Sequence, residues 1–531
     1  MTKRFFAVAL LCALLCSATA LAEPPATPEG PWTAHKDTPV TIEWFFAMED
    51  FGTRFDPENN LAHAQILADT GVSLSISSGN EEKLNMLIAT DTLPDLVSMG
   101  SNASQRVMLE NAGMLAPLEP LIEEYVPDIN IPHSMFDWYR NENTGECYAI
   151  AGAFYSDERC NPEFGGMFVT HNKNIVRADI LSQIGMTVED LQTKEGFLAA
   201  LRAVKENDIT YNGQSVMPLG AYDLEMIATQ FGWKPEAEDG SLVSLWRDEK
   251  YLEALLFLNT IYSEGLMGDE VFTWNATQRN EAVANGSVFA GIGWTGIHTS
   301  SRRALYANDN NAMFQFAGRM DGGEAVWYPG VSCQGWILTM ISANSEIQDR
   351  IIEFIAYMAT DIVTLNSEHG IGCYEIVDGK VVKLPDKQAE FDANPTLAGN
   401  KYKDNLNGFT TDWTIIQKYW PDNYSNPLEE DIAKAEMEHD ALLYDSKCFS
   451  GLDPEAGTDL AAINTMINDY WNQQVPLIIM ADSAQACEAA WRDALAEIDG
   501  MGFAQIEAYR AERFANNKAR MGLEFAYPGN R

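Results

Sequence analysis

The sequence predicts an α/β protein folded into two lobes, and three observations lead to that prediction. Short runs rich in aliphatic and β-branched residues alternate with helical patterns, an order typical of a mostly parallel sheet. The chain has 531 residues, 46% of them hydrophobic, which is enough to bury more than one core. No sequence period of roughly 20 to 50 residues recurs, so the pattern is not that of a solenoid.

The N-terminus has the pattern of a secretory signal. Residues 1–22 contain the basic pair Lys3-Arg4, an apolar run from Phe5 to about Cys16, and Ala20-Leu21-Ala22 before Glu23. The apolar run is too short and wrongly flanked for a membrane span. We therefore expect an exported protein, with a proline-rich linker over residues 23–37 after the signal peptide.

A lipid anchor is disfavoured by the residues around the two signal cysteines. Cys12 and Cys16 each follow a Leu, whereas a bacterial lipoprotein signal has a small residue directly before its cysteine. No other apolar run approaches the length of a bilayer span. These patterns predict a secreted, extracytoplasmic protein associated with the cell envelope.

Net charge argues against two classes of partner. The formal charge is -42, and removal of Lys3 and Arg4 with the signal makes it -44. Such a surface repels nucleic acid and anionic lipid. It also disfavours long-range capture of a polyanionic sugar, although a local arginine cluster could still hold one.

Six cysteines remain after the signal: Cys147, Cys160, Cys333, Cys373, Cys448 and Cys487. Their spacings are wide and contain no C-x-x-C, so neither a zinc site nor a redox motif is indicated. Cys147 and Cys160 form the best local candidate for a disulfide. Buried free cysteines are the alternative.

The first half of the chain alternates strands and helices. We expect strands at Val40–Phe46, Val72–Ile76 and Asp95–Met99, and helices at Asn60–Asp69, Glu81–Ala89 and Leu118–Tyr125. Ligands of parallel sheets bind beyond the carboxyl ends of the strands. That rule places Trp44 and the backbone from Ser98 to Ser101 at the rim of a cleft.

A second α/β unit begins after Gly165-Gly166. The pattern there predicts a strand at Phe168–Thr170, a helix at Ile175–Ile184, and a helix that begins with the N-cap Thr193. Further along we expect helices at Tyr251–Glu264, Glu346–Ala359, Ser483–Ile498 and Phe503–Asn517, a strand at Ser287–Gly293, and irregular polar chain from 394 to 458. The segment Gln334–Thr339 is the expected return of the chain to the first lobe.

The segment after that strand also resembles a known family. It reads Arg177-x-Asp179-x-Leu181-x-x-Ile184-Gly185, then Thr187, Glu189, Phe197, Leu201 and Lys205; related matches are Leu93–Val97, Gly145–Ile150, Gly286–Gly293, His369–Gly372 and Asp378–Lys380. This order is similar to that of bacterial extracellular solute-binding proteins of family 1, in the LipO-like and alginate-binding-like branch. It departs from the family at Ile180, where a Trp is usual.

The resemblance implies the type II periplasmic-binding-protein fold, which has two lobes, a hinge and an interlobe cleft. It also implies that the chain crosses the hinge more than once. We expect lobe 1 at 38–165 plus 325–385, with 483–531 as packing helices, and lobe 2 at 166–324 plus 386–482. The implied function is capture of a carbohydrate, an oligosaccharide, for the permease subunits of an ABC transporter by a monomer that binds no nucleic acid.

Aromatic residues are the main candidates for a sugar site. The chain has 13 Trp, 19 Tyr and 24 Phe, and a flat ring can stack on the C-H face of a sugar while polar groups bind its hydroxyls. The expected ligand-binding residues lie at strand ends or in loops: Trp44, Ser98, Ser101, Tyr155, Trp274, Trp294, Trp327 and Trp336. Trp471 and Trp491 lie on helices, and we expect them in the core.

No pattern indicates an enzyme, a metal or a cofactor. The loop Asn207–Gln214 keeps too few oxygen ligands for calcium, and the chain lacks G-x-S-x-G and H-E-x-x-H motifs. Gly291-x-Gly293-x-x-Gly296 has dinucleotide-like spacing without a following helix start. A secreted carbohydrate-active hydrolase and a surface lectin are the alternatives to a receptor.

Overall fold

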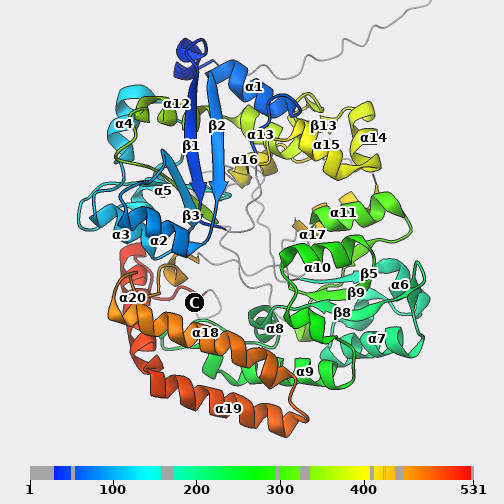
Figure 1. Ribbon diagram of the computed structural model, residues 1–531. Helices are drawn as coiled ribbons and strands as arrows, with labels where there is room; N and C mark the ends of the chain where they lie inside the picture. The colour runs from blue at the N-terminus through cyan, green and yellow to red at the C-terminus, as the bar shows by residue number, and fades with distance from the viewer. Residues whose placement is uncertain are drawn as a thin grey trace, which may run out of the picture.

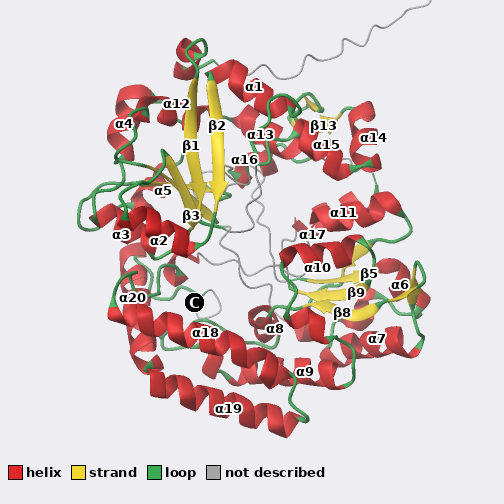
Figure 2. Cartoon of the chain, in the orientation of Figure 1, coloured by secondary structure: helices red, strands yellow, loops and turns green. Residues whose placement is uncertain are grey.

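The structure is a computed structural model that describes residues 29–48, 54–156, 173–293, 299–322, 335–406, 412–421, 424, 426–436 and 446–527. The predicted signal peptide, the expected strand Phe168–Thr170, and two expected site residues, Trp294 and Trp327, lie outside these ranges. Two separate sheets, each with its own helices, form the two halves of the molecule (Figures 1 and 2).

Sheet 1 has the strand order β2-β1-β3-β11-β4. Its strands are β1 (Val40–Phe46), β2 (Val72–Ser78), β3 (Leu96–Gly100), β4 (Ala149–Gly152) and β11 (Ile337–Ile341). β1 is parallel to β2 and β3, whereas β11 runs antiparallel to β3 and β4. β11 is therefore the expected return of the chain to the first lobe.

Helices and a 3-10 turn surround sheet 1: η1 (Pro31–His35), α1 (Leu61–Thr70), α2 (Glu81–Ala89), α3 (Gln105–Asn111), α4 (Leu118–Tyr125), α5 (His133–Tyr139), α12 (Gln348–Met358) and α13 (Asp361–His369). Asn60 caps α1 by accepting a hydrogen bond from His63 N, which stabilises the helix start that the sequence predicts. The strands of this sheet are largely buried because helices cover it.

Sheet 2 has the order β10-β5-β9-β8. Its strands are β5 (Asn174–Arg177), β8 (Met217–Ala221), β9 (Val288–Ile292) and β10 (Phe314–Phe316), and a separate hairpin pairs β6 (Thr210–Tyr211) with β7 (Gln214–Ser215). The helices of this half are α6 (Ala178–Gln183), α7 (Lys194–Glu206), α8 (Leu224–Gln230), α9 (Glu249–Ser263), α10 (Ala276–Ala284) and α11 (Thr299–Asn308).

The prediction of a helix over Ile175–Ile184 is wrong at its start. Ile175 and Val176 belong to β5, between β9 and β10, and both are buried. The helix α6 begins only at Ala178. β-branched side chains fit a doubly covered strand better than a helix, and tertiary pairing decides in their favour. Thr193, in contrast, caps α7 as predicted.

Residues 394–458 contain more helix than the sequence prediction allowed. Within this range lie α15 (Pro395–Tyr402), α16 (Trp413–Lys418) and α17 (Pro427–Glu436). Directly before it come the hairpin of β12 (Tyr374–Val377) and β13 (Lys380–Lys383) and the helix α14 (Pro385–Ala393). α14, α15 and α17 each begin with a Pro. Proline is favoured at a first helical position, so these residues were the signal for the missed helices.

Three helices end the chain: α18 (Asp459–Ile479), α19 (Ala484–Met501) and α20 (Phe503–Met521). Trp471 and Trp491 are buried in the core, as predicted. That core belongs to sheet 2, because it also contains Phe289 and Ile292 of β9. Residues 483–531 were expected to pack with lobe 1, so the packing of α19 differs from that assignment.

A contact to lobe 1 comes from the end of α20. Arg520 Nη2 donates to the carbonyls of Asp137 and Trp138 at 2.6 and 2.9 Å. The closing helices therefore pack on the second half and also touch the first.

Two further predictions concern cysteines and membrane spans. Cys147 is a free, buried thiol, so it forms no disulfide in this structure. Cys160, the cysteine expected to pair with it, lies outside the described residues.

Within the described part of the chain, no helix is both long enough and apolar enough to cross a bilayer.

Candidate functional site

The carboxyl edge of sheet 1 presents an exposed indole. Trp336, directly before β11, lies beside the end of β3 because Ser101 N donates to its carbonyl at 3.0 Å. Trp336 N donates in turn to Gly152 O at the end of β4, also at 3.0 Å. The Trp336 side chain is 48% exposed. The backbone thus holds a free aromatic face at the rim where ligands of such sheets bind.

A cavity of about 740 Å³, here called the edge cavity, begins beside this rim. Its wall on the side of lobe 1 consists of the loop residues 101–104 after β3 together with Arg106 and Val107 of α3. The opposite wall consists of α8, the loop before α9, the segment after η9 (Ser446–Phe449), and α20, represented by Glu225, Trp233, Trp246, Leu452, Phe503 and Tyr509. Both lobes therefore contribute to one cavity.

Stacked aromatic rings stiffen the lobe 2 wall of the edge cavity. The Trp246 ring lies 4.6 Å from that of Trp471, with planes inclined by 14°, and 5.3 Å from that of Phe503. Trp491 Nε1 donates to the Trp246 carbonyl at 2.9 Å. These contacts hold the half-buried Trp246 indole in place at the cavity surface.

Charged groups of both signs line the same cavity. Arg106 donates to Glu110 Oε1 at 2.5 Å, and Arg510 donates to Asp453 Oδ1 at 2.7 Å. Among the described residues, no side chain donates a hydrogen bond to Glu225, which is exposed at the cavity surface while the surrounding protein limits the water around its carboxyl. That desolvation, aided by the nearby Asp223 carboxylate, raises the pKa of Glu225 to about 7.

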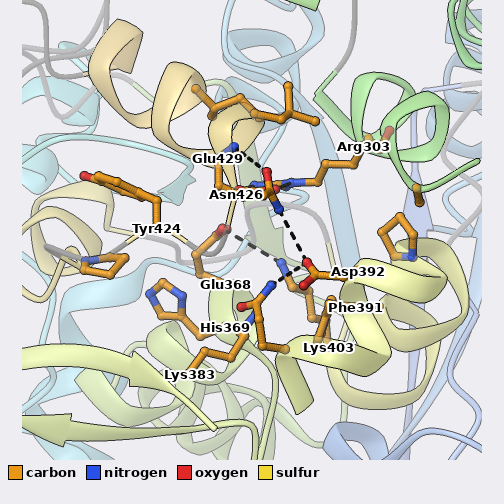
Figure 3. A pocket seen from close by; sticks show the side chains of 18 of the residues that line it. Arg303, Glu368, His369, Lys383, Phe391, Asp392, Lys403, Tyr424, Asn426 and Glu429 are labelled. Atoms are coloured by element: carbon orange, nitrogen blue, oxygen red, sulfur yellow. Dashed lines mark hydrogen bonds and ion pairs between the residues drawn. The ribbon is translucent and has the colours of Figure 1, made fainter. Parts of the chain in front are cut away.

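A second cavity of about 440 Å³ lies between α11 and α17 on one side and α13, β13, α14 and α15 on the other (Figure 3). α15 packs against α1 of lobe 1, and α11 packs against α14 and α15. We call it the α11–α15 cavity. This cavity also lies between the two halves of the molecule, because α13 belongs to the first half and α11 to the second.

Three cations and three acids line the α11–α15 cavity: Arg303, Lys383, Lys403, Glu368, Asp392 and Glu429. Arg303 donates to both oxygens of Glu429, at 2.6 and 2.7 Å. Lys403 Nζ lies 3.8 Å from Glu368 Oε1, and Figure 3 shows this pair. Burial opposes the ionisation of Glu368, but Lys403 together with the other basic groups around it outweighs burial and holds the pKa of that carboxyl below its ordinary value.

The wall of this cavity also contains polar atoms without partners. His369 is 8% exposed, and its Nε2 has no hydrogen-bond partner among the described residues; the same is true of Trp420 Nε1. Burial lowers the pKa of His369 to about 3, so its ring is neutral at ordinary pH. Since buried polar groups are normally satisfied, these atoms mark places where a ligand hydroxyl could bind.

Trp44 and Ser98 lie inside sheet 1 rather than on a cleft surface. Trp44 is 1% exposed, and its Nε1 donates to Ser98 Oγ at 2.8 Å. Ser98 Oγ is also 2.6 Å from Thr339 Oγ1. β1 has a paired strand on each side, so its large side chains pack between the sheet and its helices. In this conformation neither residue offers a free surface to a ligand.

The other expected site residues are spread over the molecule. Ser101 lines the edge cavity, and Trp336 lies next to it. Tyr155 is 2% exposed, and Trp274 is half-buried against the hydrophobic clusters of the second half. The described structure therefore brings together two of these residues, Ser101 and Trp336.

Sequence reasoning missed most of the residues that line the two cavities. Glu225 follows the N-cap Asp223 of α8 directly after β8, a position at a strand end that could have been noticed. His369 lies in the segment His369–Gly372 that resembles the family. Arg303, Lys383 and Lys403 come from three separate elements, and no local pattern connects them.

Metal ligands do not gather in the described part of the chain: no group of three or more His, Cys, Asp or Glu side chains there could hold an ion. At the loop considered for calcium, β6 and β7 form a tight hairpin, with Asn212 and Gly213 both at positive φ. Such backbone is typical of a two-residue hairpin turn.

Comparison with protein families finds no match to this chain. Among curated proteins, the lipoprotein LipO of Bacillus subtilis (strain 168) is 21% identical over 328 residues, which cover 58% of this chain and 62% of LipO. The match thus spans less than two thirds of that relative. Because LipO is a lipoprotein, it gives no support to the expectation that a lipid anchor is disfavoured here.

Solved structures match over nearly the whole chain. The ABC-transporter substrate-binding protein FusA of S. pneumoniae, in complex with kestose, has a TM-score of 0.62 at 16% identity and covers 90% of this chain and 100% of its own. The alginate-binding protein AlgQ2 has a TM-score of 0.60 at 15% identity, with 90% and 98% covered. These matches confirm the two-lobed α/β fold of solute-binding proteins and the resemblance that the motifs indicate.

Proposed function

We propose that this protein is an extracytoplasmic receptor that captures a carbohydrate, an oligosaccharide, between its lobes and delivers it to an ABC importer. The observation that carries the proposal is the edge cavity, in which aromatic rings of lobe 2 face polar groups of lobe 1, with the Trp336 indole beside it at the carboxyl edge of sheet 1. Ligand sites of this kind are concave, largely apolar and supplied with a few oriented polar groups. The proteins of similar fold named above bind kestose or alginate.

Closure of the lobes would couple sugar binding to recognition by the permease. A sugar that touches Trp336 and Ser101 on lobe 1 and Trp246 on lobe 2 gains its full set of contacts only in the closed form. The ligand then stabilises that form by its differential affinity for the two states. The permease subunits would recognise the closed monomer, and the protein itself would perform no chemistry on the sugar.

One observation favours a second candidate, a secreted carbohydrate-active hydrolase. Glu225 has a pKa raised to about 7 and lies in a cavity with other carboxyl groups, such as Glu507. A glycosidase needs a carboxylic acid that is still protonated near neutral pH. The receptor needs no turnover, so the two functions differ in a measurable product.

The deciding experiment incubates the purified protein with a panel of oligosaccharides. Thermal melting measures binding, and chromatography of the sugars measures cleavage. The receptor is supported by a rise in melting temperature without products, and a product that disappears in Glu225→Gln supports the hydrolase. Small-angle scattering then separates a hinged receptor, which becomes more compact with ligand, from a rigid surface lectin. No melting shift and no product with any sugar would contradict all three.

A further inference from the structure

The α11–α15 cavity is unusually rich in cations for this chain. The whole sequence has 77 acidic residues against 35 basic ones, about two acids for each base. The cavity wall has as many cations as acids. In a protein of net charge -42, three basic side chains directed at one cavity are a local departure from the general surface.

The acids of this wall already have donors. Glu429 is held by Arg303 through two hydrogen bonds. Asp392 accepts from the amides of Gln388 and Asn426 at 2.7 and 3.5 Å. Lys403 and Glu368 form a loose pair at 3.8 Å. None of these carboxylates needs a further cation from a ligand.

Arg303 and Lys403 each form an ion pair with a carboxylate of this wall, whereas Lys383 forms none at contact distance with a described carboxylate. Lys383 Nζ instead lies 3.8 Å from the centroid of the Phe391 ring. Burial, together with repulsion from Lys403 and Arg303, lowers the pKa of Lys383 to about 8, and the attraction of the Glu368 carboxylate offsets only part of this effect. An anion placed beside Lys383 and Lys403 would relieve that repulsion and keep the Lys383 ammonium group charged.

The remainder of the wall suits a sugar ring. His369 Nε2 and Trp420 Nε1 lack partners, as described above, and can bind hydroxyls. Tyr306, Phe391 and Tyr424 line the same cavity and supply aromatic surface. Cations, free polar atoms and rings in one cavity are the groups needed to hold a sugar that carries a negative charge.

We propose that the α11–α15 cavity binds an anionic substituent, specifically a carboxylate, on the carbohydrate held between the lobes, with Lys383 and Lys403 as its counter-ions. This inference rests on the proposed receptor function and narrows its ligand to acidic sugars. The negative surface of the protein slows the approach of such a ligand, whereas the local cations stabilise it once bound. The negative surface therefore controls how fast the ligand is captured, and the local cations control how tightly it is held.

The test measures calorimetric affinities for matched oligosaccharides that differ only in charge: a neutral sugar, its uronate form and its sulfate ester. We expect the uronate to bind about tenfold more tightly than the neutral form, a difference of about 1.4 kcal/mol. In Lys383→Met the ratio of the two affinities falls toward one. Lys380→Met removes the same charge from the same strand outside the cavity and keeps the ratio.

Each outcome has a separate meaning. Equal affinities for neutral and uronate sugars in the unmodified protein would overturn this inference and leave the receptor function intact. Absence of binding by all sugars would overturn the proposed function and this inference with it. Tighter binding of the sulfate ester would support an anion site and refute the choice of carboxylate. Titrations at rising salt repeat the test without a variant, because the preference for an anion must then shrink.

Discussion

The edge cavity and the α11–α15 cavity both lie between the two lobes, but desolvation drives a different kind of group toward its neutral form in each. In the edge cavity that group is an acid, Glu225, whose pKa is raised to about 7. In the α11–α15 cavity it is an amine, Lys383, whose pKa is lowered to about 8. The aromatic stack around Trp246 has no counterpart of the same kind among the described rings of the second cavity.

Under the proposed function, we infer that one ligand is divided between the two cavities. Rings and hydroxyl-binding groups in the edge cavity suit the uncharged part of an oligosaccharide. The cations of the α11–α15 cavity suit its charged substituent. A rise in pH through 7 and 8 ionises Glu225 and discharges Lys383, so both changes weaken the binding of an anion. Four experiments test this division, beginning with the largest expected effect.

Trp246→Ala removes the indole between Trp471 and Phe503. We expect the free energy of unfolding to fall by about 2 to 3 kcal/mol, because a large half-buried ring is lost and the stack is opened. Urea unfolding measures this loss. Trp246→Phe keeps a ring in the stack and should restore more than half of it. A loss below about 0.5 kcal/mol in Trp246→Ala would mean that the stack does not support the cavity wall.

Trp336→Ala tests the exposed indole at the rim. We expect sugar affinity to fall about tenfold, or about 1.4 kcal/mol, with little change in unfolding free energy because the side chain is 48% exposed. Calorimetry and urea unfolding measure the two quantities. The control is Leu477→Ala on α18, an exposed apolar side chain outside both cavities. Equal affinities of Trp336→Ala and the unmodified protein would show that the rim at Trp336 is not part of the sugar site.

Glu429→Gln tests how the charge of the α11–α15 cavity affects ligand affinity. The substitution keeps the shape of the side chain but removes the carboxylate that binds Arg303. The cavity then gains one net positive charge, and we expect affinity for an acidic sugar to rise about threefold, or about 0.7 kcal/mol. Glu430→Gln, exposed on the same helix, is the control. A decrease in affinity would show that Glu429 itself touches the ligand.

Glu225→Gln should change how stability depends on pH. The folded protein binds a proton at Glu225 more tightly than the unfolded chain does, because the pKa rises from 4.5 to about 7. The unmodified protein therefore loses stability at this residue as pH rises between those values. Across this window the variant should gain stability relative to it, as urea unfolding at several pH values can show. Glu238→Gln, in an exposed turn, should show no such trend.

Much of the first lobe could be predicted from local sequence. The structure has β1 at Val40–Phe46, α2 at Glu81–Ala89 and α4 at Leu118–Tyr125, with the expected bounds. These segments are short, have a clear periodicity and end at turn or capping residues. The failure at Ile175 shows the limit, because a short apolar segment fits either helix or strand until its neighbours are known.

The site was less accessible to sequence reasoning. Trp44 and Trp336 look alike as tryptophans at strand ends, yet one is 1% exposed and the other 48%. The difference arises because Trp44 lies within a central strand, whereas Trp336 precedes an antiparallel strand and extends past the sheet edge. The sequence alone could identify both tryptophans as candidates but could not show which of them is exposed.

The sequence by itself determined the α/β character, the division into two halves and the resemblance to extracellular solute-binding proteins, because periodicity and motifs are properties of neighbouring residues. Only the tertiary structure decided that α19 packs on the second half and that Arg303, Lys383 and Lys403 line one cavity. The physical reason is that a cavity is formed by residues far apart in the chain. Their mutual distances depend on how buried surfaces pack together, and no local pattern records that packing.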